Sequence, residues 1–433
     1  MARANVTVIV NDESFFIPGT ESGGTSRAGM PSYYNLIGAV GTTADRKAGV
    51  MTVENISDWI ASLKSFDPIG NDDISAAGNP VTQANDSMGA PFIHGTTSDE
   101  GSTQLLAGNS YAGGTYARWP KGPTGNWKNE WWAVHNYLQY GGVCIIAGTA
   151  SDGGYSDTAA RLQDKTIPLD VVFGATGDYN STLSTICTTR GDCISVSAAI
   201  GDAVLGDASS GASSDAIHDE FNVSVWGKKK HLDIFRTLNE ETGTGWITTD
   251  CAADVAGCLV RTDRLADPWW SPAGFRRGQI LDVVEMQNNP SDSEMDTMYD
   301  AGINPVVTFP GEGTVLFGDK TLAASSSTLS RINVSRLFIF LKKTIGAAAR
   351  AKLFEFNDPQ TRTSFVNAVV PVLNRIQARR GIYDFKVICD DSNNPGSIVD
   401  ANQFVADVFI KPAKSINFIR LTFTNKNTQD TLE

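Results

Sequence analysis

In roughly the last hundred residues, apolar side chains recur at more regular intervals than anywhere else in the chain. This spacing is the sequence feature that constrains the fold most. An apolar stripe predicts a helix over about 333–353; its members are Val334, Leu337, Phe338, Leu341 and Ile345. A second helix is predicted to begin at Asp358, an N-cap residue followed by Pro359. Its pattern ends near Gly381, and Pro371 should kink it. Strand-like runs follow at 385–389, 405–410 and 416–423. Two helices and three strands predict a small α+β domain whose sheet keeps an open edge.

Upstream of this region, short strand-like runs alternate with helical patterns. Helices are predicted over 57–66 and 127–140. Strands are predicted over 34–40, 143–147, 169–173, 193–199, 221–226 and 303–308. Strands that alternate with helices predict an α/β domain with a largely parallel sheet. The stretch from about 69 to 126 is rich in Gly, Asn, Ser, Asp and Thr, so we expect a surface insertion there.

The N-terminal residues form a separate pattern. An alternating apolar run leads through two phenylalanines to a Pro-Gly turn signal and predicts a short strand; its apolar members are Val6, Val8, Val10, Phe15 and Phe16. Residues 21–29 are mostly Gly, Ser and Thr with little to bury, which predicts a flexible link, and a second link is expected around 411–415. We therefore expect three parts, namely an arm and linker over 1–25, a middle α/β domain over 26–328, and a C-terminal domain over 329–433 that ends in a strand over 415–433.

The chain is acidic, with a net charge of −13, and the charge is unevenly distributed. From Arg331 onward there are 15 Lys and Arg against 9 Asp and Glu, whereas the preceding residues hold 20 basic and 39 acidic side chains. An acidic chain is a poor match for nucleic acid, because phosphate binding needs a concentrated basic surface. Two interpretations of this uneven charge stay open. The first is that a basic domain lies beside an acidic one by chance, and the second is that a basic face docks on an acidic partner.

The residues that usually carry chemistry are sparse and scattered. The six cysteines are too few for a disulfide framework and lack zinc-site spacing, so we expect buried free thiols; they are Cys144, Cys187, Cys193, Cys251, Cys258 and Cys389. The four histidines show no metal or nucleophile spacing, and His135 is expected to be a packed surface histidine on a helix. Residues 1–13 hold no apolar stretch typical of a signal peptide, and no run has the length of a membrane span. We therefore expect a soluble chain made in a cytoplasm, without direct membrane insertion.

Two further motifs have ordinary explanations. The glycines at 311, 313 and 318 before Lys320 resemble a phosphate loop loosely, but Asp319 takes the place that the lysine needs, so a turn-rich connection explains them better. Adjacent carboxylates such as Asp390 and Asp391 are common in solvated loops, although calcium binding stays an alternative. The sequence thus predicts no catalytic residue, no metal and no cofactor, and we expect a protein that is not an enzyme.

Several segments of the C-terminal part are similar to a known family. The run from Val399 through Pro412 to Phe423, with an acidic residue inside a strand, a proline-marked turn and a last strand rich in Phe and Ile, resembles the ending of contractile tail sheath proteins of myovirus-type bacteriophages and related contractile injection systems. Further segments resemble the family in its order: 260–274, 317–322, 333–337, 354–362 and 379–383. Together they span about 257–424. Residues 69–130 and 177–245 show no resemblance.

The resemblance implies a structural subunit that stacks as rings in a helical lattice around an inner tube and contracts to drive the tube through a bacterial envelope. It implies a place in the virion tail, assembled in the host cytoplasm, and as partners further copies of the chain, the tail tube protein, and baseplate and tail terminator proteins. The residue patterns suggest how neighbours are joined, because a tethered strand and an open sheet edge are the two halves of β-strand augmentation. The residues expected in the exchanged strands are Val6, Val8, Val10, Phe15, Phe16, Ile419, Leu421 and Phe423.

Basic residues of the C-terminal domain are candidates for contact with the tube. They are Lys342, Lys343, Arg375, Arg379 and Arg380. As an alternative, they are solvated residues near helix ends that complement the helix dipole. Two other classes of protein also stay open. A tube or capsid subunit would share the arms and the missing catalysis, and a surface hydrolase would need convergent carboxylates or a triad in a pocket.

Overall fold

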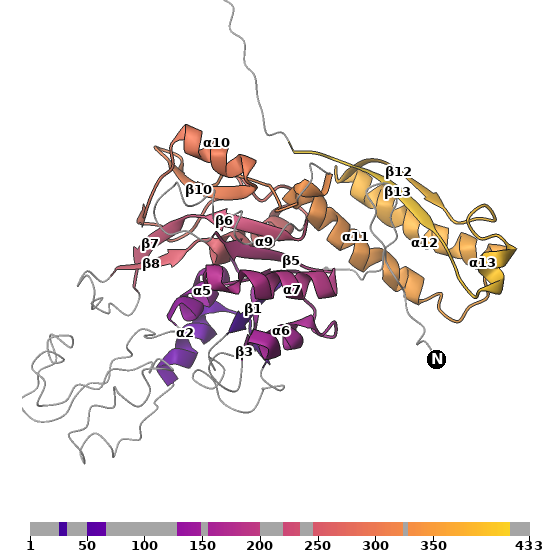
Figure 1. Cartoon of the computed structure of the whole chain (residues 1–433), viewed down its shortest axis with the longest axis horizontal. Coiled ribbons are helices and arrows are strands. Elements are labelled where there is room, and N and C mark those ends of the chain that lie inside the picture. The colour runs from indigo at the N-terminus through magenta and orange to yellow at the C-terminus, as the bar shows by residue number, and fades with distance from the viewer. Residues whose placement is uncertain are drawn as a thin grey trace, which may run out of the picture.

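The computed structural model describes residues 26–32, 50–65, 128–148, 155–199, 220–233, 246–323 and 328–415 (Figure 1). Several sequence predictions lie outside these residues. They are the N-terminal strand, the strand over 34–40, the insertion over 69–126 and the last strand over 416–423.

An eight-stranded sheet forms the middle of the chain, in the order β11-β10-β6-β5-β4-β1-β3-β2. Its strands are β1 Arg27–Ser32, β2 Val50–Val53, β3 Val143–Gly148, β4 Val171–Phe173, β5 Ile194–Ala198, β6 Asn222–Trp226, β10 Ile303–Phe309 and β11 Gly313–Leu316. Every neighbouring pair is parallel except the two outermost ones, β2 with β3 and β10 with β11. The largely parallel sheet predicted from the alternating pattern is therefore confirmed.

Strand β1 corrects the prediction of a flexible link over 21–29. Residues 27–29 belong to this strand, which is buried from its second residue onward and pairs in parallel with β3 on one side and β4 on the other. Its sequence contains Gly29 and Pro31, which hide the strand pattern. The glycine leaves little room for a side chain, because a Cβ at position 29 would lie 3.0 Å from Leu169 Cδ2, which would have to shift slightly.

Helices cover the sheet on both faces, since all residues of β5 and β6 are buried. Helix α5 packs on α9, and α6 packs on α7. The helices of this part are α2 Ile56–Ser65, α5 Lys128–Leu138, α6 Tyr155–Gln163, α7 Asn180–Arg190, α9 Ala252–Leu265 and α10 Asp292–Asp300, with a 3-10 turn, η4, at Gly177–Tyr179. The predicted helices over 57–66 and 127–140 correspond to α2 and α5.

A small three-stranded sheet, β8-β7-β9, lies beside the main sheet and buries a charged pair. Its strands are β7 Lys228–Leu232, β8 Trp246–Asp250 and β9 Glu285–Met286. From β7, Lys229 donates to Asp254 of α9 at 2.8 Å and to the Leu281 carbonyl at 2.9 Å, and both charged side chains have no exposed surface. Tyr140 links the same groups, because its hydroxyl donates to Asp254 and accepts from the Leu281 amide.

Two histidines lie next to this charged pair in the core. The rings of His135 and His231 each contact Trp132, with centroids 4.9 Å away, and His135 also stacks on Trp131. Burial lowers the pKa of both histidines to about 4. The prediction that His135 is a packed surface histidine is therefore wrong in placing it at the surface, because the rings of Trp131 and Trp132 pack against it and its side chain is buried.

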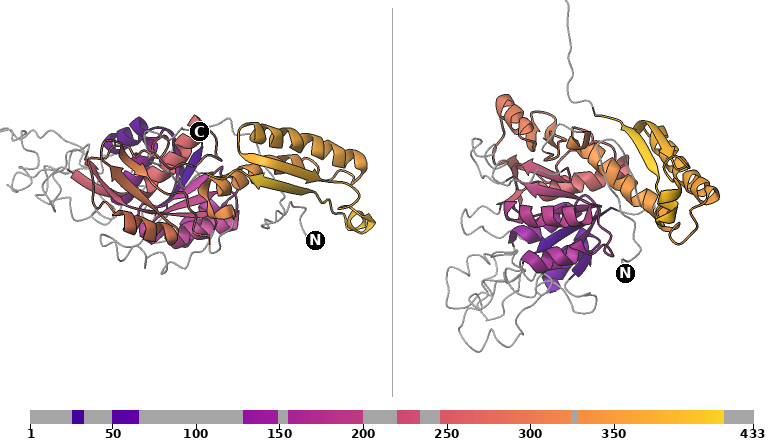
Figure 2. Two further views of the ribbon diagram at one scale, coloured as in Figure 1. Left: turned by 90° about the horizontal axis from the view of Figure 1, so that it is seen from above. Right: turned by 45° about the vertical axis from the view of Figure 1, so that its right-hand side comes forward.

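The C-terminal domain forms a separate lobe beside the main sheet (Figures 1 and 2). It consists of a 3-10 turn, η5, at Thr328–Ser330, the helices α11 Ile332–Arg350, α12 Pro359–Ala378 and α13 Gly396–Asp400, and the strands β12 Ile382–Ile388 and β13 Asp407–Pro412. Both long helices were predicted, and Asp358 caps α12 as expected by accepting from the Thr361 amide at 2.7 Å. A second hydrophobic core lies between the two helices and the strands, whereas Ile332 and Ile339 of α11 pack into the first core.

Candidate assembly surface

The sheet of the C-terminal domain has two strands within the described residues, and neither of its outer edges pairs with a further strand there. Strands β12 and β13 are antiparallel, with Phe385 opposite Ile410 and Val387 opposite Val408. One face of this pair packs on the second core, and the other face exposes Tyr383 and Phe409. An edge of this kind presents free backbone N–H and C=O groups to an added strand.

A row of ion pairs joins the C-terminal domain to the middle of the chain, and we call it the charged seam. In each pair the cation comes from the C-terminal domain and the carboxylate from the middle domain. The pairs are Arg331–Asp319 at 2.9 Å, Arg336–Asp263 at 2.6 Å, Lys343–Asp170 at 2.7 Å and Arg379–Asp267 at 3.0 Å. The uneven charge of the sequence is thus at least partly matched within the chain, since the acidic partner of the basic domain is its own middle domain.

The Arg336–Asp263 pair is the most buried member of the seam, with side chains 5% and 11% exposed. Asp263 also accepts from the Ser26 hydroxyl at 2.6 Å, just before β1 begins. Burial raises the pKa of Asp263, and Arg336 opposes that rise. The start of the described chain, α9 and α11 therefore meet at one carboxylate.

The five basic residues that the sequence suggested as tube contacts fall into two groups. Lys342 lies over the Phe221 ring, where burial lowers its pKa, and Lys343 donates to Asp170, so both face the middle domain of their own chain. Arg375, Arg379 and Arg380 are exposed at the C-terminal end of α12. Arg379 also reaches Asp267 while nearly half of its side chain stays in solvent. An exposed basic cluster therefore remains at one end of α12.

The second flexible link, expected around 411–415, is hydrogen-bonded in this structure. Its first two residues complete β13. Ala413 donates to the Gly381 carbonyl at 3.0 Å and accepts from Asn333, and the Ser415 hydroxyl donates to Asp319 at 2.5 Å. The prediction of a free link is therefore wrong for these residues, because the seam fixes them beside the start of α11.

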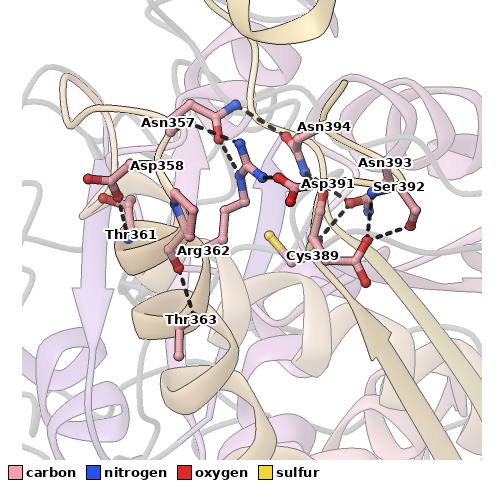
Figure 3. Close-up of polar contacts among 12 residues, drawn as sticks. Asn357, Asp358, Thr361, Arg362, Thr363, Cys389, Asp391, Ser392, Asn393 and Asn394 are labelled. Atoms are coloured by element: carbon pink, nitrogen blue, oxygen red, sulfur yellow. Dashed lines mark hydrogen bonds and ion pairs between the residues drawn. The ribbon is translucent and has the colours of Figure 1, made fainter. Parts of the chain in front are cut away.

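A network of polar side chains fixes the end of the C-terminal domain that carries the α11–α12 loop and α13 (Figure 3). Arg362 is 5% exposed; its Nε donates to Asn357 Oδ1 at 2.7 Å, and its guanidinium pairs with Asp391. Asn357 donates to the Gln403 carbonyl at 2.7 Å and to Asn394 at 3.2 Å. Asn394 is buried and exchanges two bonds with the Val405 backbone. The network ties the α11–α12 loop to the loops on either side of α13.

The loop fixed by this network presents two phenylalanines to solvent. Phe354 is 92% exposed and Phe356 is 85% exposed, with the exposed Glu355 between them. Phe354 has a φ of 71°, a left-handed conformation that costs about 1 kcal/mol or more for a residue with a side chain. The sequence marked this loop only as part of 354–362, which resembles the sheath family, and did not predict that its phenylalanines are exposed. The available signal was two phenylalanines separated by one glutamate in the short connection between two amphipathic helices.

The described residues contain few of the groups that catalysis uses. Among them, no group of three or more His, Cys, Asp or Glu side chains is placed to hold a metal ion. The six cysteines are buried and free, as predicted. Gly311 lies in the turn between β10 and β11, Gly313 is the first residue of β11, and Asp319 pairs with Arg331, so the loose phosphate-loop pattern is a hairpin connection. The search of the described helices found none with the length and apolar character needed to cross a membrane.

The fold and this surface define a class of protein, an α/β subunit with a smaller α+β domain whose sheet edges stay open and whose loops expose aromatic residues. The model for the phage tail sheath protein central domain matches residues 180–322, and the model for the phage tail sheath C-terminal domain matches residues 324–426. The two matches together cover more than half of the chain. The chain therefore belongs to the phage tail sheath family.

Relatives of known identity agree with this assignment. The chain is 51% identical over 219 residues to the tail sheath protein of Vibrio phage KVP40, which covers 49% of this chain and 32% of that protein. It is 35% identical over 288 residues to the tail sheath protein of Enterobacteria phage T4, which covers 64% of this chain and 41% of that protein. The chain thus matches less than half of the length of either relative.

Solved structures show the same fold at low sequence identity. The sheath complex of an extracellular contractile injection system, PVC, in the contracted state has a TM-score of 0.64 at 15% identity, and the match covers 99% of this chain and 100% of that chain. The helical sheath of the anti-feeding prophage in the contracted state has a TM-score of 0.62 at 13% identity, with coverage of 98% and 99%. The sheath fold extends over nearly the whole chain.

Proposed function

We propose that this chain is a structural subunit of a contractile tail sheath. It polymerises as stacked rings around a tail tube in the virion tail, and the sheath shortens to drive the tube through the host envelope. The observation that carries the proposal is the family membership combined with the unpaired edges of β12–β13 within the described residues. No residue has a catalytic role in this function. The sheath assembles in the host cytoplasm, and baseplate and tail terminator proteins bind at its ends.

Within this proposal, neighbouring copies are joined by exchanged strands. The arm over 1–25 of one copy and the last strand over 415–433 of another add to the edges of β12 and β13, while the domains over 26–328 and 329–433 move as bodies. A strand added to an edge gains main-chain hydrogen bonds along its length. Because the donor and acceptor surfaces differ, each copy can bind the next one, and contacts of this kind build rings where the rotation between copies closes and a helix where it does not.

The arm is tested by charge placed on one face of its strand. In a first variant, Val6→Asp, Val8→Asp and Val10→Asp put three carboxylates at alternate positions, which share one face. A matched control carries Asn5→Asp, Thr7→Asp and Asn11→Asp, with the same added charge on the other face. By negative-stain electron microscopy, we expect helical tubes from the wild-type chain and the control but not from the first variant. Tubes from all three proteins would refute strand exchange through this arm, and no tubes from the wild-type chain would count against the sheath proposal itself.

We further propose that the exposed basic cluster at the end of α12 faces the tube. Lys342 and Lys343 are left out of this surface because the middle domain covers them. Exposed charge pairs contribute about 1 kcal/mol or less each and weaken with salt, so contacts of this kind can break when the sheath moves.

Charge reversal tests the basic cluster. Arg375→Glu with Arg380→Glu is expected to weaken binding of the chain to purified tail tubes at physiological salt and to flatten its salt dependence, since two exposed cations become anions. Lys386→Glu, an exposed reversal on β12, is the control and should leave binding unchanged. Co-sedimentation with tubes measures both. Equal binding by the double variant and the wild-type chain would show that this end of α12 does not face the tube.

A further inference from the structure

A second aromatic surface lies at the opposite end of the molecule from the loop that carries Phe354 and Phe356. Phe275 and Phe317 are 40% and 44% exposed, and both pack on Phe309 of β10, with ring centroids 5.4 and 5.0 Å from it. We call these three residues the aromatic patch. Backbone bonds fix the patch, because Gly274 donates to the Leu316 carbonyl and Phe317 donates to the Pro305 carbonyl.

The loop is equally well fixed. We call Phe354, Glu355 and Phe356 the aromatic loop. Glu355 donates to the Lys352 carbonyl at 3.2 Å, and Asp358 donates to the Phe356 carbonyl at 3.0 Å. Directly behind it, the network around Arg362 locks Asn357. Two nearly fully exposed phenylalanines on a fixed loop cost little additional entropy when they bind, which is typical of residues that anchor an interface.

The charges beside the two aromatic surfaces are complementary. Glu355 lies between the phenylalanines of the loop, whereas Arg276 and Arg277 follow Phe275 of the patch, and Arg276 is exposed. One carboxylate, Glu312, lies in the turn next to the patch, so the basic residues outnumber it. A loop of sequence Phe-Glu-Phe therefore suits a patch that begins Phe-Arg-Arg.

The positions of the two surfaces exclude a contact within one chain. The turn between α11 and α12 lies at the lower right of Figure 1 and β10 at the upper left, and the right-hand view of Figure 2 keeps them apart. Two different surfaces on distant parts of one subunit can meet only between copies, and such a contact repeats from each copy to the next.

We propose that the aromatic loop of one copy docks on the aromatic patch of a neighbouring copy, with Glu355 facing Arg276. This inference rests on the proposed sheath assembly and adds a second contact between copies, made by side chains and independent of the exchanged strands. It also accounts for the left-handed backbone at Phe354, which is kept because it directs the aromatic side chain outward from the loop.

Cross-linking tests the pairing of the two surfaces. All six native cysteines are buried, so a chain with Glu355→Cys and Arg276→Cys gains one accessible thiol in each surface at the two positions proposed to face each other, and all the phenylalanines are kept. Under oxidising conditions, the assembled double variant should give a ladder of disulfide-linked multimers on a non-reducing gel, and each single variant should give none. The absence of a ladder, or a dimer band from a single variant, would overturn the pairing.

The contribution of the loop is tested with Phe354→Gly. Glycine adopts a φ of 71° without strain, so the thermal midpoint of the unassembled chain should stay the same or rise. The critical concentration for tube formation should increase by about tenfold or more, as for an interface anchor. The reversal Glu355→Arg should also raise it, and Arg276→Glu added to that variant should restore it.

Leu265→Ser, which removes another apolar side chain that is 65% exposed, is the control. It should leave the critical concentration unchanged, and an equal effect from it would overturn the specific contact. If the wild-type chain forms tubes and Phe354→Gly forms them at the same concentration, this inference fails while the sheath proposal stands. If the wild-type chain forms no tubes, the sheath proposal fails and this inference fails with it.

Discussion

Lys229→Met is expected to lower the free energy of unfolding by about 3–5 kcal/mol, the largest effect of any single substitution considered for this chain. The ammonium group of Lys229 and the carboxylate of Asp254 are both fully buried; Asp254 Oδ1 accepts from Lys229 and Tyr140, whereas Oδ2 has no hydrogen-bond partner. Removing the lysine leaves the carboxylate paired only with the Tyr140 hydroxyl. Burial already raises the pKa of Asp254, and loss of Lys229 raises it further, so the variant should bind a proton there when it folds.

The neighbouring lysine provides a matched control for this substitution. Lys230 pairs with Glu285 at 3.5 Å, and the two side chains are 40% and 68% exposed. Lys230→Met is expected to change the free energy of unfolding by less than about 1 kcal/mol. Urea titrations followed by tryptophan fluorescence measure both variants. Similar midpoints for the two variants would mean that the buried pair contributes no more than an exposed one.

Acidification from pH 7 to pH 5 is expected to lower the free energy of unfolding by about 2 kcal/mol for each of the two buried histidines. His135 and His231 have a pKa of about 4 in the folded chain, against about 6.5 when unfolded. A lowered pKa means that the unfolded chain binds more protons below pH 6.5. The stability is therefore fully present above that value and is lost as the pH falls toward 4.

A histidine variant isolates this effect. His135→Gln cannot take up the proton, so it should lose about half of the change in unfolding free energy between pH 7 and pH 5. The carboxylate of Asp282 lies 3.7 Å from His231 and favours the protonated form of both rings, but burial outweighs it at each histidine. Urea unfolding at the two pH values gives the comparison. An unchanged pH dependence in His135→Gln would show that other groups cause the acid sensitivity.

Much of the fold followed from local sequence patterns. The apolar stripe from Val334 to Ile345 predicted α11, and the N-cap at Asp358 predicted α12. Each of these signals is formed by residues that lie close together in the sequence. The alternation of strands and helices predicted the parallel sheet for the same reason. Strand β1 was missed because what makes it a strand is its pairing with residues more than a hundred positions away. Strand β7 begins with three successive lysines, and no local pattern in the sequence predicts that the middle one, Lys229, is buried.

The candidate surface was less predictable. The sequence predicts both Lys343 and Arg375 to be exposed cations on helices. The packing of the two domains shows that Lys343 belongs to the charged seam, whereas Arg375 is exposed. The eight residues expected in exchanged strands lie outside the described residues, so strand exchange stays a prediction. The segment with the aromatic loop was noted only for its resemblance to the family. Its exposure was not predicted, because single exposed phenylalanines are ordinary and the network that holds Phe354 and Phe356 in solvent joins residues distant in sequence.

The position of β1 also determines how this subunit responds to pulling. A load carried along the chain at residue 26 enters a strand that is paired along its whole length, from Arg27 opposite Val143 to Ser32 opposite Gly148. The load acts along the strand, so these hydrogen bonds resist together in shear. Strand β13, at the other end of the described chain, pairs among the described strands with β12 alone, and hydrogen bonds of Ala413 and Ser415 add to this pairing. Tension passed from copy to copy would thus act on a strand paired on both sides at the N-terminal attachment and on a strand paired on one side at the C-terminal one.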